Sequence, residues 1–353
     1  MAKKVKTIGI MTSGGDCPGL NGVIRAATRT AINDYGMRVY GILDGYEGLV
    51  DGRYMKLDWN DVSGILTCGG TILGTSNKAD PIGQKRVGDV FKNCRKMKLD
   101  ALICAGGDGS MNISYALFKR GLNVVGIPKT IDNDLEGTDV TFGFDSAVQS
   151  ACNAIDAIHT TAQSHHRVMI IEVMGRYAGW IALYSGIASG GDIILIPEIP
   201  FDINKVCDKV KERHRHGKRF SIIVIAEGAK PFGGELTVRQ VVKDSPDQVR
   251  LGGIGNKIAY QIENLTGIET RVTVLGHLLR GGSPTAFDRI LATRFGSESV
   301  KAAAERKFGY MVALKGTRIG TVKLQKAIKE LRLVKPNAPI IRIARALGTS
   351  FGN

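Results

Sequence analysis

Two buried strands that each end in an unusual polar turn constrain the fold of this chain more than any other feature. The apolar run 101–105 ends in the turn GGDGS at 106–110, and the apolar run 122–127 ends in PKTIDND at 128–134. Apolar runs bounded by glycine and polar residues are typical of fully buried strands. Helical patterns separate such runs, and this alternation predicts an α/β fold of two doubly wound, mainly parallel sheets.

The same alternation continues through the second half of the chain. We expect strands at 6–11, 38–43, 101–105, 122–127, 168–173, 193–196, 220–226 and 271–275. Between them we expect helices at 18–35, 83–97, 111–120, 145–164, 176–188 and 203–215.

The glycines of GGDGS allow backbone N–H groups to approach a bulky anion, because no Cβ stands in the way. A carboxylate among them would repel a phosphate unless a cation lay between, so Asp108 is interpreted as a Mg²⁺-directed ligand. Asp132 and Asp134 add carboxylates from a neighbouring strand end, where open α/β sheets place their chemistry. A second strand–glycine–helix junction, TSGGD at 12–16, would present helix amides to a phosphate. Together these turns predict a phosphate-transfer site.

The composition of the chain limits the classes of molecule that it is expected to bind. The chain has 353 residues, 43% hydrophobic and 23% charged, and a formal net charge of +15. This length favours two domains. The charge suits nucleic acid, a membrane surface or anionic small substrates, but few aromatic residues lie among the basic ones, so we expect no nucleic acid partner. No apolar run reaches the roughly 18 residues of a membrane span, so we expect no membrane either.

The six cysteines show no metal-type spacing, which indicates reduced thiols in a cytoplasmic protein. Cys17 follows a glycine turn, but no base is suggested nearby in the sequence. We therefore interpret Cys17 as a structural thiol and not as a nucleophile.

Cationic side chains recur close to the expected strand ends. They are Arg167, Arg176, Arg271, His277 and Arg280. A lone arginine in such a place is usually a surface residue. Several together suit an anion with more than one charge, because guanidinium groups match phosphate oxygens.

Five segments together resemble the 6-phosphofructokinase family. They are TSGGDCPGLN, GGDGS, PKTIDND, SHHRVMIIEVMGRYAGW and TRVTVLGHLLRGGSPTAFDR, in the family's order over nearly the whole chain. GGDGS alone also occurs in NAD kinases and diacylglycerol-type lipid kinases, whereas the combination is specific. The resemblance implies ATP-dependent, Mg²⁺-assisted transfer of the γ-phosphoryl group to the 1-hydroxyl of fructose 6-phosphate, which gives fructose 1,6-bisphosphate in glycolysis.

The resemblance also implies a role for each matching residue. Asp132 would be the general base, Thr130 would orient the attacking hydroxyl, and Arg176 would stabilise charge on the transferring group. The donor and its Mg²⁺ would be bound by Gly15, Asn77, Lys78, Gly107, Asp108, Gly109 and Ser110, with Asp108 as the metal ligand. The sugar phosphate would be bound by Thr130, Ile131, Asp132, Arg167, Met174, Gly175, Arg176, Glu227, Arg271, His277 and Arg280.

Two positions bear on the phosphoryl donor. Gly109 stands where pyrophosphate users of the family have aspartate, which favours ATP, whereas Lys129 precedes TIDND as in pyrophosphate enzymes. The combination resembles a subgroup of ATP-using members. An open pocket permits ATP, while a lysine only adds favourable charge, so we expect ATP. A pyrophosphate-dependent phosphotransferase is the alternative, and a non-catalytic regulatory homologue is a remoter one.

Asn77 departs from the family pattern, because well-known bacterial ATP enzymes have an arginine there that bridges the donor and acceptor phosphates. Lys78 beside it supplies charge but no bidentate fork.

By the resemblance, a nucleotide-binding domain spans 1–142 and 278–328, a sugar-phosphate-binding domain spans 143–277 and 329–353, and the active cleft lies between them. In the family Arg167 and Arg271 reach in from a neighbouring subunit, which implies a homo-oligomer, most often a tetramer.

Overall fold

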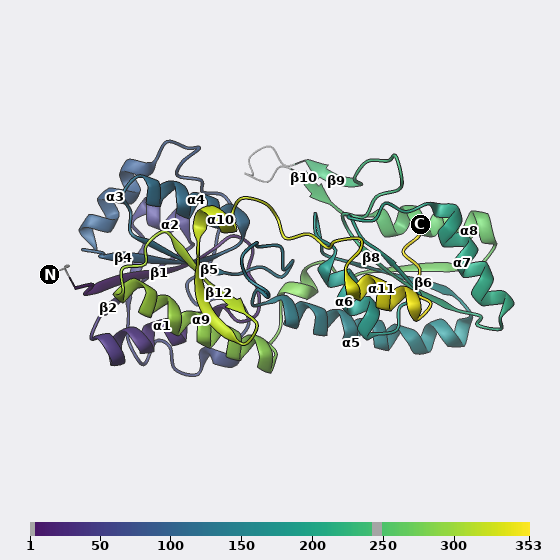
Figure 1. The fold of residues 1–353 in the computed structure, drawn as a ribbon, viewed down its shortest axis with the longest axis horizontal. Coiled ribbons are helices and arrows are strands. Elements are labelled where there is room, and N and C mark those ends of the chain that lie inside the picture. Colours follow the sequence, from purple (N-terminus) through teal and green to yellow (C-terminus); the bar gives the residue numbers. More distant parts are fainter. Residues whose placement is uncertain (1–3, 242–248) are drawn as a thin grey trace. The chain divides into compact units, whose positions relative to one another are not determined.

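The computed structural model describes residues 4–241 and 249–353, which form two compact units. Of these residues, unit 1 contains 4–146 and 280–331, and unit 2 contains 147–241, 249–279 and 332–353. Each unit is therefore assembled from segments that are distant in sequence, as the colours of Figure 1 show.

Unit 1 is built on a seven-stranded sheet in the order β13-β12-β5-β4-β1-β2-β3. Five neighbouring strands run parallel, and the antiparallel strands β3 and β13 form the two edges. The strands are β1 (Thr7–Ser13), β2 (Arg38–Ile42), β3 (Tyr54–Leu57), β4 (Ala101–Gly106), β5 (Val124–Pro128), β12 (Tyr310–Lys315) and β13 (Arg318–Lys323).

Helices cover both faces of this sheet (Figure 1). One face carries α1 (Leu20–Tyr35) and α9 (Ala286–Ala304). The other carries α2 (Tyr46–Asp51), α3 (Val87–Lys96), α4 (Asp108–Lys119) and α10 (Leu324–Ala327). A short 3₁₀ helix, η1 (Ile65–Thr67), contacts α1. Both faces are buried, which is why β1, β4 and β5 are apolar throughout and do not alternate.

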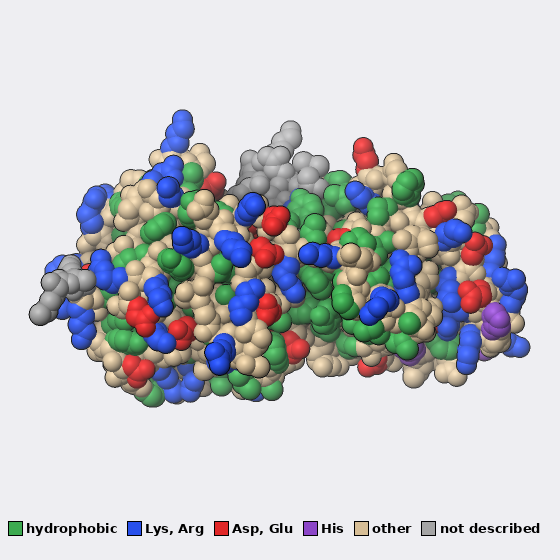
Figure 2. Space-filling model, in the orientation of Figure 1, with side chains coloured by type: hydrophobic (Ala, Val, Ile, Leu, Met, Phe, Trp, Pro, Cys, Tyr) green, Lys and Arg blue, Asp and Glu red, His purple; other side chains and the backbone are tan. Residues whose placement is uncertain are grey.

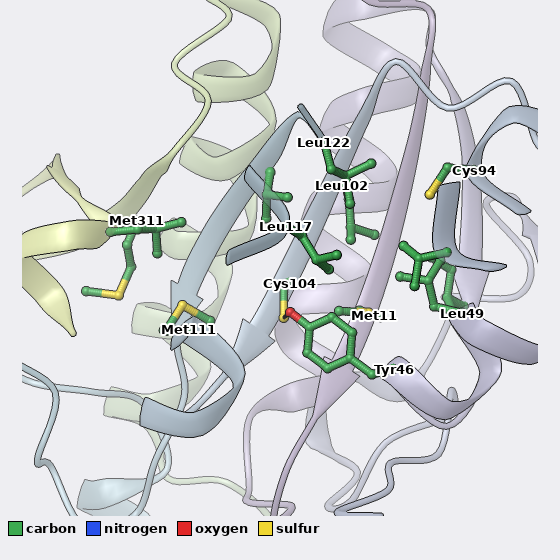
Figure 3. Close-up of a cluster of buried hydrophobic side chains, with 14 of the residues drawn as sticks. Met11, Tyr46, Leu49, Cys94, Leu102, Cys104, Met111, Leu117, Leu122 and Met311 are labelled. Atoms are coloured by element: carbon green, nitrogen blue, oxygen red, sulfur yellow. Dashed lines mark hydrogen bonds between the residues drawn. The ribbon is translucent and has the colours of Figure 1, made fainter. Parts of the chain in front are cut away.

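The core beneath α2, α3 and α4 contains one buried phenol (Figure 3). The Tyr46 hydroxyl donates to the Ser110 carbonyl at 3.1 Å, lies 2.7 Å from the Ser114 hydroxyl, and points toward Cys104. A buried hydroxyl needs such partners to offset its loss of water. These contacts connect α2 to the first two turns of α4.

Unit 2 is built on a four-stranded, fully parallel sheet in the order β11-β6-β8-β7. The strands are β6 (Val168–Val173), β7 (Ile193–Leu195), β8 (Ser221–Ala226) and β11 (Thr270–Val274). The helices are α5 (Phe144–His165), which starts in unit 1, α6 (Trp180–Ala188), α7 (Ile203–Arg215), α8 (Ile254–Thr266), the 3₁₀ helix η2 (Gly276–Arg280) and α11 (Pro339–Ala346). The strands β9 (Val238–Val241) and β10 (Val249–Leu251) form a separate two-stranded antiparallel sheet.

The chain after α11 extends the sheet of unit 2 beyond β7. Ile194 N–H donates to the Ser350 carbonyl at 2.9 Å, and Ser350 N–H donates to the Asp192 carbonyl at 3.0 Å. The next side chain, Phe351, is only 1% exposed. The tail is therefore an integral part of the core of unit 2.

The predicted fold class is confirmed, and each expected strand is present within about two residues. Three helix starts are wrong: α3 begins at Val87 instead of 83, α4 at Asp108 instead of 111, and α6 at Trp180 instead of 176. Two of these corrections matter for the site, because Asp108 lies inside a helix and Arg176 lies in a loop.

Two surface properties complete the description. No helix within residues 4–241 and 249–353 combines the length and apolar composition that a bilayer crossing requires. On the face drawn in Figure 2, lysine and arginine side chains are interspersed with acidic and apolar ones over each unit. The net charge of +15 therefore forms no continuous basic stripe on that face.

Candidate active site

The β1–α1 turn of unit 1 is approached by two cations. The Lys129 ammonium donates to the Gly15 carbonyl, and the Arg280 guanidinium donates to the Asp16 carbonyl at 3.0 Å. A Cβ at Gly15 would lie 2.6 Å from the Arg280 Nη1, so a side chain there would have to displace the guanidinium. Gly14 adopts φ +84°, which disfavours other residues. The turn is thus a glycine-lined, electropositive junction.

GGDGS forms the junction between β4 and α4. Gly107 caps the helix, and Asp108, Gly109 and Ser110 are its first three residues. Amides in the first turn of a helix have no partner within the helix and can bind an anion. A Cβ at Gly106 would lie 2.3 Å from the Ser110 Cβ. The close approach of β4 to α4 therefore requires glycine at position 106.

Gly109 differs from the glycines around it, because nothing lies within 4 Å of the place where its Cβ would be. Its backbone is exposed at the start of α4. The place that a side chain at position 109 would enter is therefore open.

The β5 end carries the second set of carboxylates. Thr130 accepts a hydrogen bond from Asp132 N–H at 3.1 Å through its hydroxyl. Asn133 adopts φ +51°, and its side chain accepts from Thr141 N–H at 3.0 Å, which fixes the turn. Burial raises the pKa of Asp134 to about 7, with the charges of Asp132 and then Asp108 adding to the effect. Because these carboxylates interact electrostatically, the ends of β4 and β5 form one acidic site.

The residues at this site fit a Mg²⁺ ion. Asp108 accepts from the Asn112 side chain at 3.0 Å, and its pKa is raised by burial, which the Asn112 bond opposes. The buried Oδ1 of Asp134 makes no hydrogen bond. Within the described residues, no group of three or more His, Cys, Asp and Glu side chains could by itself hold a metal ion. Mg²⁺ needs only one or two carboxylates when waters and phosphates complete its shell.

The loop that carries Asn77 and Lys78 is tied to the β1–α1 turn. The Thr75 hydroxyl donates to the Gly14 carbonyl at 2.6 Å, and the Asn77 side-chain oxygen lies 3.8 Å from the place of a Gly14 Cβ. Asn77 and Lys78 are exposed. The structure thus brings Gly15, Asn77 and the β1–α1 turn together.

Cys17 belongs to the same β1–α1 turn and is fully buried. Burial raises the pKa of its thiol to about 12, so the thiolate is scarce at neutral pH. This supports the interpretation of Cys17 as a structural thiol.

In unit 2, Met174, Gly175, Arg176 and Glu227 follow the neighbouring strands β6 and β8 at the same sheet edge. Glu227 N–H donates to the Val173 carbonyl at 2.9 Å, and the Arg176 guanidinium lies 4.8 Å from the Tyr177 ring centroid. His277 follows β11 at this edge and is exposed.

Arg167 and Arg271 lie at the opposite, amino-terminal edge of that sheet, where β6 and β11 begin. Glu269 accepts hydrogen bonds from both guanidinium groups, from Arg167 at 2.7 Å. Unit 2 therefore does not bring these two arginines together with Met174, Arg176 and Glu227. This separation is compatible with their serving another copy of the chain.

Sequence reasoning missed three partners of the expected site residues. Asn112 holds the Asp108 carboxylate, and its spacing of four residues would have been a signal only if the helix had been expected to start at Asp108 instead of 111. Glu269 joins two arginines and lies two residues before Arg271, so its position was visible but ambiguous. Glu198 had no local signal, since it contacts the Arg176 loop only through the fold.

The comparisons with known proteins agree with one another. A profile of the phosphofructokinase family matches residues 7–303. The chain is 51% identical to the ATP-dependent 6-phosphofructokinase 2 of Clostridium perfringens over 100% of both chains. Phosphofructokinase from Saccharomyces cerevisiae has a solved structure with a TM-score of 0.80 and 33% identity, covering 92% of this chain and 45% of the yeast chain. A pyrophosphate-dependent phosphofructokinase from Marinobacter aquaeolei, at 21% identity and 98% and 88% coverage, shares the fold with a TM-score of 0.82. The profile and the full-length identity place this chain in the phosphofructokinase family.

Proposed function

We propose that this chain is an ATP-dependent 6-phosphofructokinase that transfers the γ-phosphoryl group of ATP to the 1-hydroxyl of fructose 6-phosphate. Full-length identity of 51% to a protein of that name supports the activity. The observation that carries the choice of donor is the open space at Gly109, where nothing lies within 4 Å of a built Cβ.

The donor phosphates would be bound at the glycine junctions of unit 1. The first-turn amides of α4, at Asp108, Gly109 and Ser110, point out of the helix start, and Gly107 precedes them. Gly15 would let the β1–α1 junction approach the phosphates, with Asn77 and Lys78 in the exposed loop beside it. Asp108 would be the protein ligand of Mg²⁺, which would neutralise phosphate charge and orient the donor.

Asp132 would take the proton of the 1-hydroxyl while Thr130 orients that hydroxyl. Phosphoryl transfer depends mainly on positioning and charge neutralisation, so Arg176 would supply the positive charge needed by the transferring group. Ile131, Met174, Gly175 and Glu227 would bind the sugar.

The 6-phosphate would be bound by His277 and Arg280 together with Arg167 and Arg271 of another copy. The position of the last two arginines at the far edge of their own sheet supports this assignment. We therefore propose that the chain forms a homo-oligomer, which by the resemblance is a tetramer. We also propose that the enzyme is cytoplasmic. Unit 1 would be the nucleotide-binding domain and unit 2 the sugar-phosphate-binding domain.

Pyrophosphate is the second candidate donor because Lys129 precedes TIDND. The Lys129 side chain is only 4% exposed, its ammonium bonds to the Gly15 carbonyl, and burial lowers its pKa. A lysine engaged in this way supports the turn and is not presented to solvent as a phosphate-binding charge. This geometry favours ATP.

Initial rates with fructose 6-phosphate and Mg²⁺, with ATP and pyrophosphate offered separately, test the proposal. Coupling fructose 1,6-bisphosphate to aldolase detects the product. Turnover with ATP alone is expected. Turnover with pyrophosphate alone would show that Lys129 sets the donor. No turnover with either, in a folded sample that binds ATP, would indicate another acceptor or a regulatory homologue.

A further inference from the structure

The loop that carries Arg176 runs from the end of β6 to the start of α6 and is held from both sides. On the β6 side, Gly228 N–H donates to the Gly175 carbonyl at 3.1 Å, and a Cβ at Gly228 would lie 1.9 Å from the Arg176 carbonyl. Gly175 itself adopts φ +141°. Only glycine at both positions permits this contact, so the loop backbone is fixed just before and at Arg176.

On the α6 side the loop is held by a carboxylate from another segment. Glu198, between β7 and α7, accepts from Gly179 N–H with both oxygens, at 3.0 and 3.1 Å. Gly179 caps α6 without any side-chain bond of its own. A Cβ there would lie 2.4 Å from the Ile196 Cβ and 2.9 Å from the Glu198 Oε2. The close approach of Glu198 to the loop therefore depends on a glycine at 179.

The same carboxylate also holds a third segment. Val334 N–H donates to the Glu198 Oε1 at 2.8 Å. Two residues earlier, the Arg332 carbonyl accepts from the Trp180 indole N–H at 2.8 Å, and the Arg332 guanidinium lies 4.4 Å from the Trp180 ring centroid. Glu198 thus joins the Arg176 loop to the chain that returns to unit 2 at Arg332.

These contacts reach beyond the capping of one helix. An isolated cap would need one acceptor near the first turn of α6, whereas Glu198 satisfies N–H groups from two segments with one half-buried carboxylate. Arg176 lies between the Gly228 contact and the Glu198 contact, with only Tyr177 and Ala178 before Gly179. Without the Glu198 contact the loop would be held only at its Gly175–Arg176 end, so the segment that carries the Arg176 side chain would be less precisely positioned.

We propose that Glu198 is a positioning residue for phosphoryl transfer, which acts through Arg176 by fixing the loop between β6 and α6. The proposal rests on the proposed function, in which Arg176 stabilises the transferring group. The proposal predicts that replacing Glu198 lowers kcat by more than any loss of folded protein would explain.

Glu198→Ala and Glu198→Gln test the proposal against Asp202→Ala. Asp202 is a matched control because it lies in the same connection and its carboxylate also accepts a backbone N–H, from Asn204 at 2.8 Å, but at the start of α7. We expect Glu198→Ala to lower kcat about tenfold with the KM for ATP unchanged, since small misplacements of a positioned group are costly. Glu198→Gln keeps one acceptor oxygen and should retain more of kcat. Asp202→Ala should keep the wild-type kcat.

A double-mutant cycle separates positioning from general destabilisation. If Glu198 acts through Arg176, Glu198→Ala should change the residual kcat of an Arg176→Ala enzyme by less than about twofold. Equal losses in both backgrounds would overturn the proposal, as would equal losses for Glu198→Ala and Asp202→Ala. If Glu198→Ala fails to fold, the same cycle is run with Glu198→Gln.

We call the hydrogen bonds of Glu198 with Gly179 and Val334 the tether. Hydrogen exchange tests the tether without a measurement of enzyme activity. In Glu198→Ala, the amides of 176–179 and Val334 should exchange faster, while in Asp202→Ala they should match wild type. Unchanged exchange at these amides would refute the tether. If the wild-type enzyme lacked turnover with fructose 6-phosphate while these amides responded, the proposed function would fail and the tether would stand.

Discussion

Gly109→Asp is the substitution that tests donor choice most directly. Apart from its chain neighbours and its own helix, nothing lies within 4 Å of the Gly109 Cβ position, so a Cβ is accommodated there without a clash. Gly109 is the second residue of α4, where an acidic side chain stabilises a helix by about 0.3–1 kcal/mol. We therefore expect Gly109→Asp to fold with wild-type stability or slightly more.

The substitution should weaken ATP binding, because the α-phosphate of ATP would lie close to the new carboxylate. Two unit charges about 5.5 Å apart repel by about 3 kcal/mol at an effective dielectric constant of about 20. Screening at this exposed turn reduces the repulsion to about 1.5–2.5 kcal/mol. This range corresponds to a rise in the KM for ATP of about 10- to 70-fold.

Steady-state kinetics with varied ATP and saturating fructose 6-phosphate measure this change, and thermal unfolding checks the fold. Gly88→Asp is a matched control, because Gly88 is the second residue of α3, is exposed, has nothing within 4 Å of its Cβ position and also neighbours an aspartate. It should leave the KM for ATP unchanged. A folded Gly109→Asp enzyme with a KM for ATP within twofold of wild type would refute the steric and electrostatic argument.

Three further predictions concern other parts of the chain. Asp132→Asn should lower kcat about 10²- to 10⁴-fold, which rapid-quench kinetics measure, and an unchanged kcat would exclude Asp132 as the base. The same substitution should lower the pKa of Asp134, because the Asp132 charge helps to raise it; ¹³C NMR titration measures this pKa. Burial raises the pKa of Asp288 from 3.8 to about 6, so folding takes up a proton there, and the stability from this group is full below about pH 4 and lost as pH rises through about 6. Urea unfolding from pH 4 to 7 should therefore show wild type losing about 3 kcal/mol relative to Asp288→Asn, and parallel curves would contradict this reasoning. Phe351→Ala should reduce the free energy of unfolding by about 3–5 kcal/mol because it empties a site in the core of unit 2, and a loss below about 1 kcal/mol in denaturant titration would mean that the tail is not packed as described.

The eight expected strands could be predicted from the sequence because each is an apolar run that leads into a polar turn, whereas β3, β9, β10, β12 and β13 were not predicted. Parallel strands covered on both faces produce that pattern, and it places their polar ends at one edge. The acidic site at the ends of β4 and β5 was therefore predictable from GGDGS and PKTIDND. So was the distance between Arg167 and Met174, since one precedes β6 and the other follows it.

The helix starts near the site could not be predicted, for a physical reason. Sequence signals for a helix start depend on a Ser, Thr, Asp or Asn side chain at the N-cap. Here α4 is capped by Gly107 and α6 by Gly179, neither of which has a side chain. The acceptor for Gly179 is Glu198, which is distant in sequence. The conformation of the Arg176 loop is thus determined by tertiary contacts.

The discontinuous composition of unit 1 has a consequence for its synthesis. β5 pairs with β12, but about 180 residues separate them along the chain. At about 5–20 residues per second, the ribosome takes roughly 9–36 s to supply the missing partner. During that time the apolar strand β5, buried throughout in the finished fold, is an unpaired edge that other chains can join. Yield in the cell should therefore depend on how well nascent chains are shielded, even where the completed enzyme is stable.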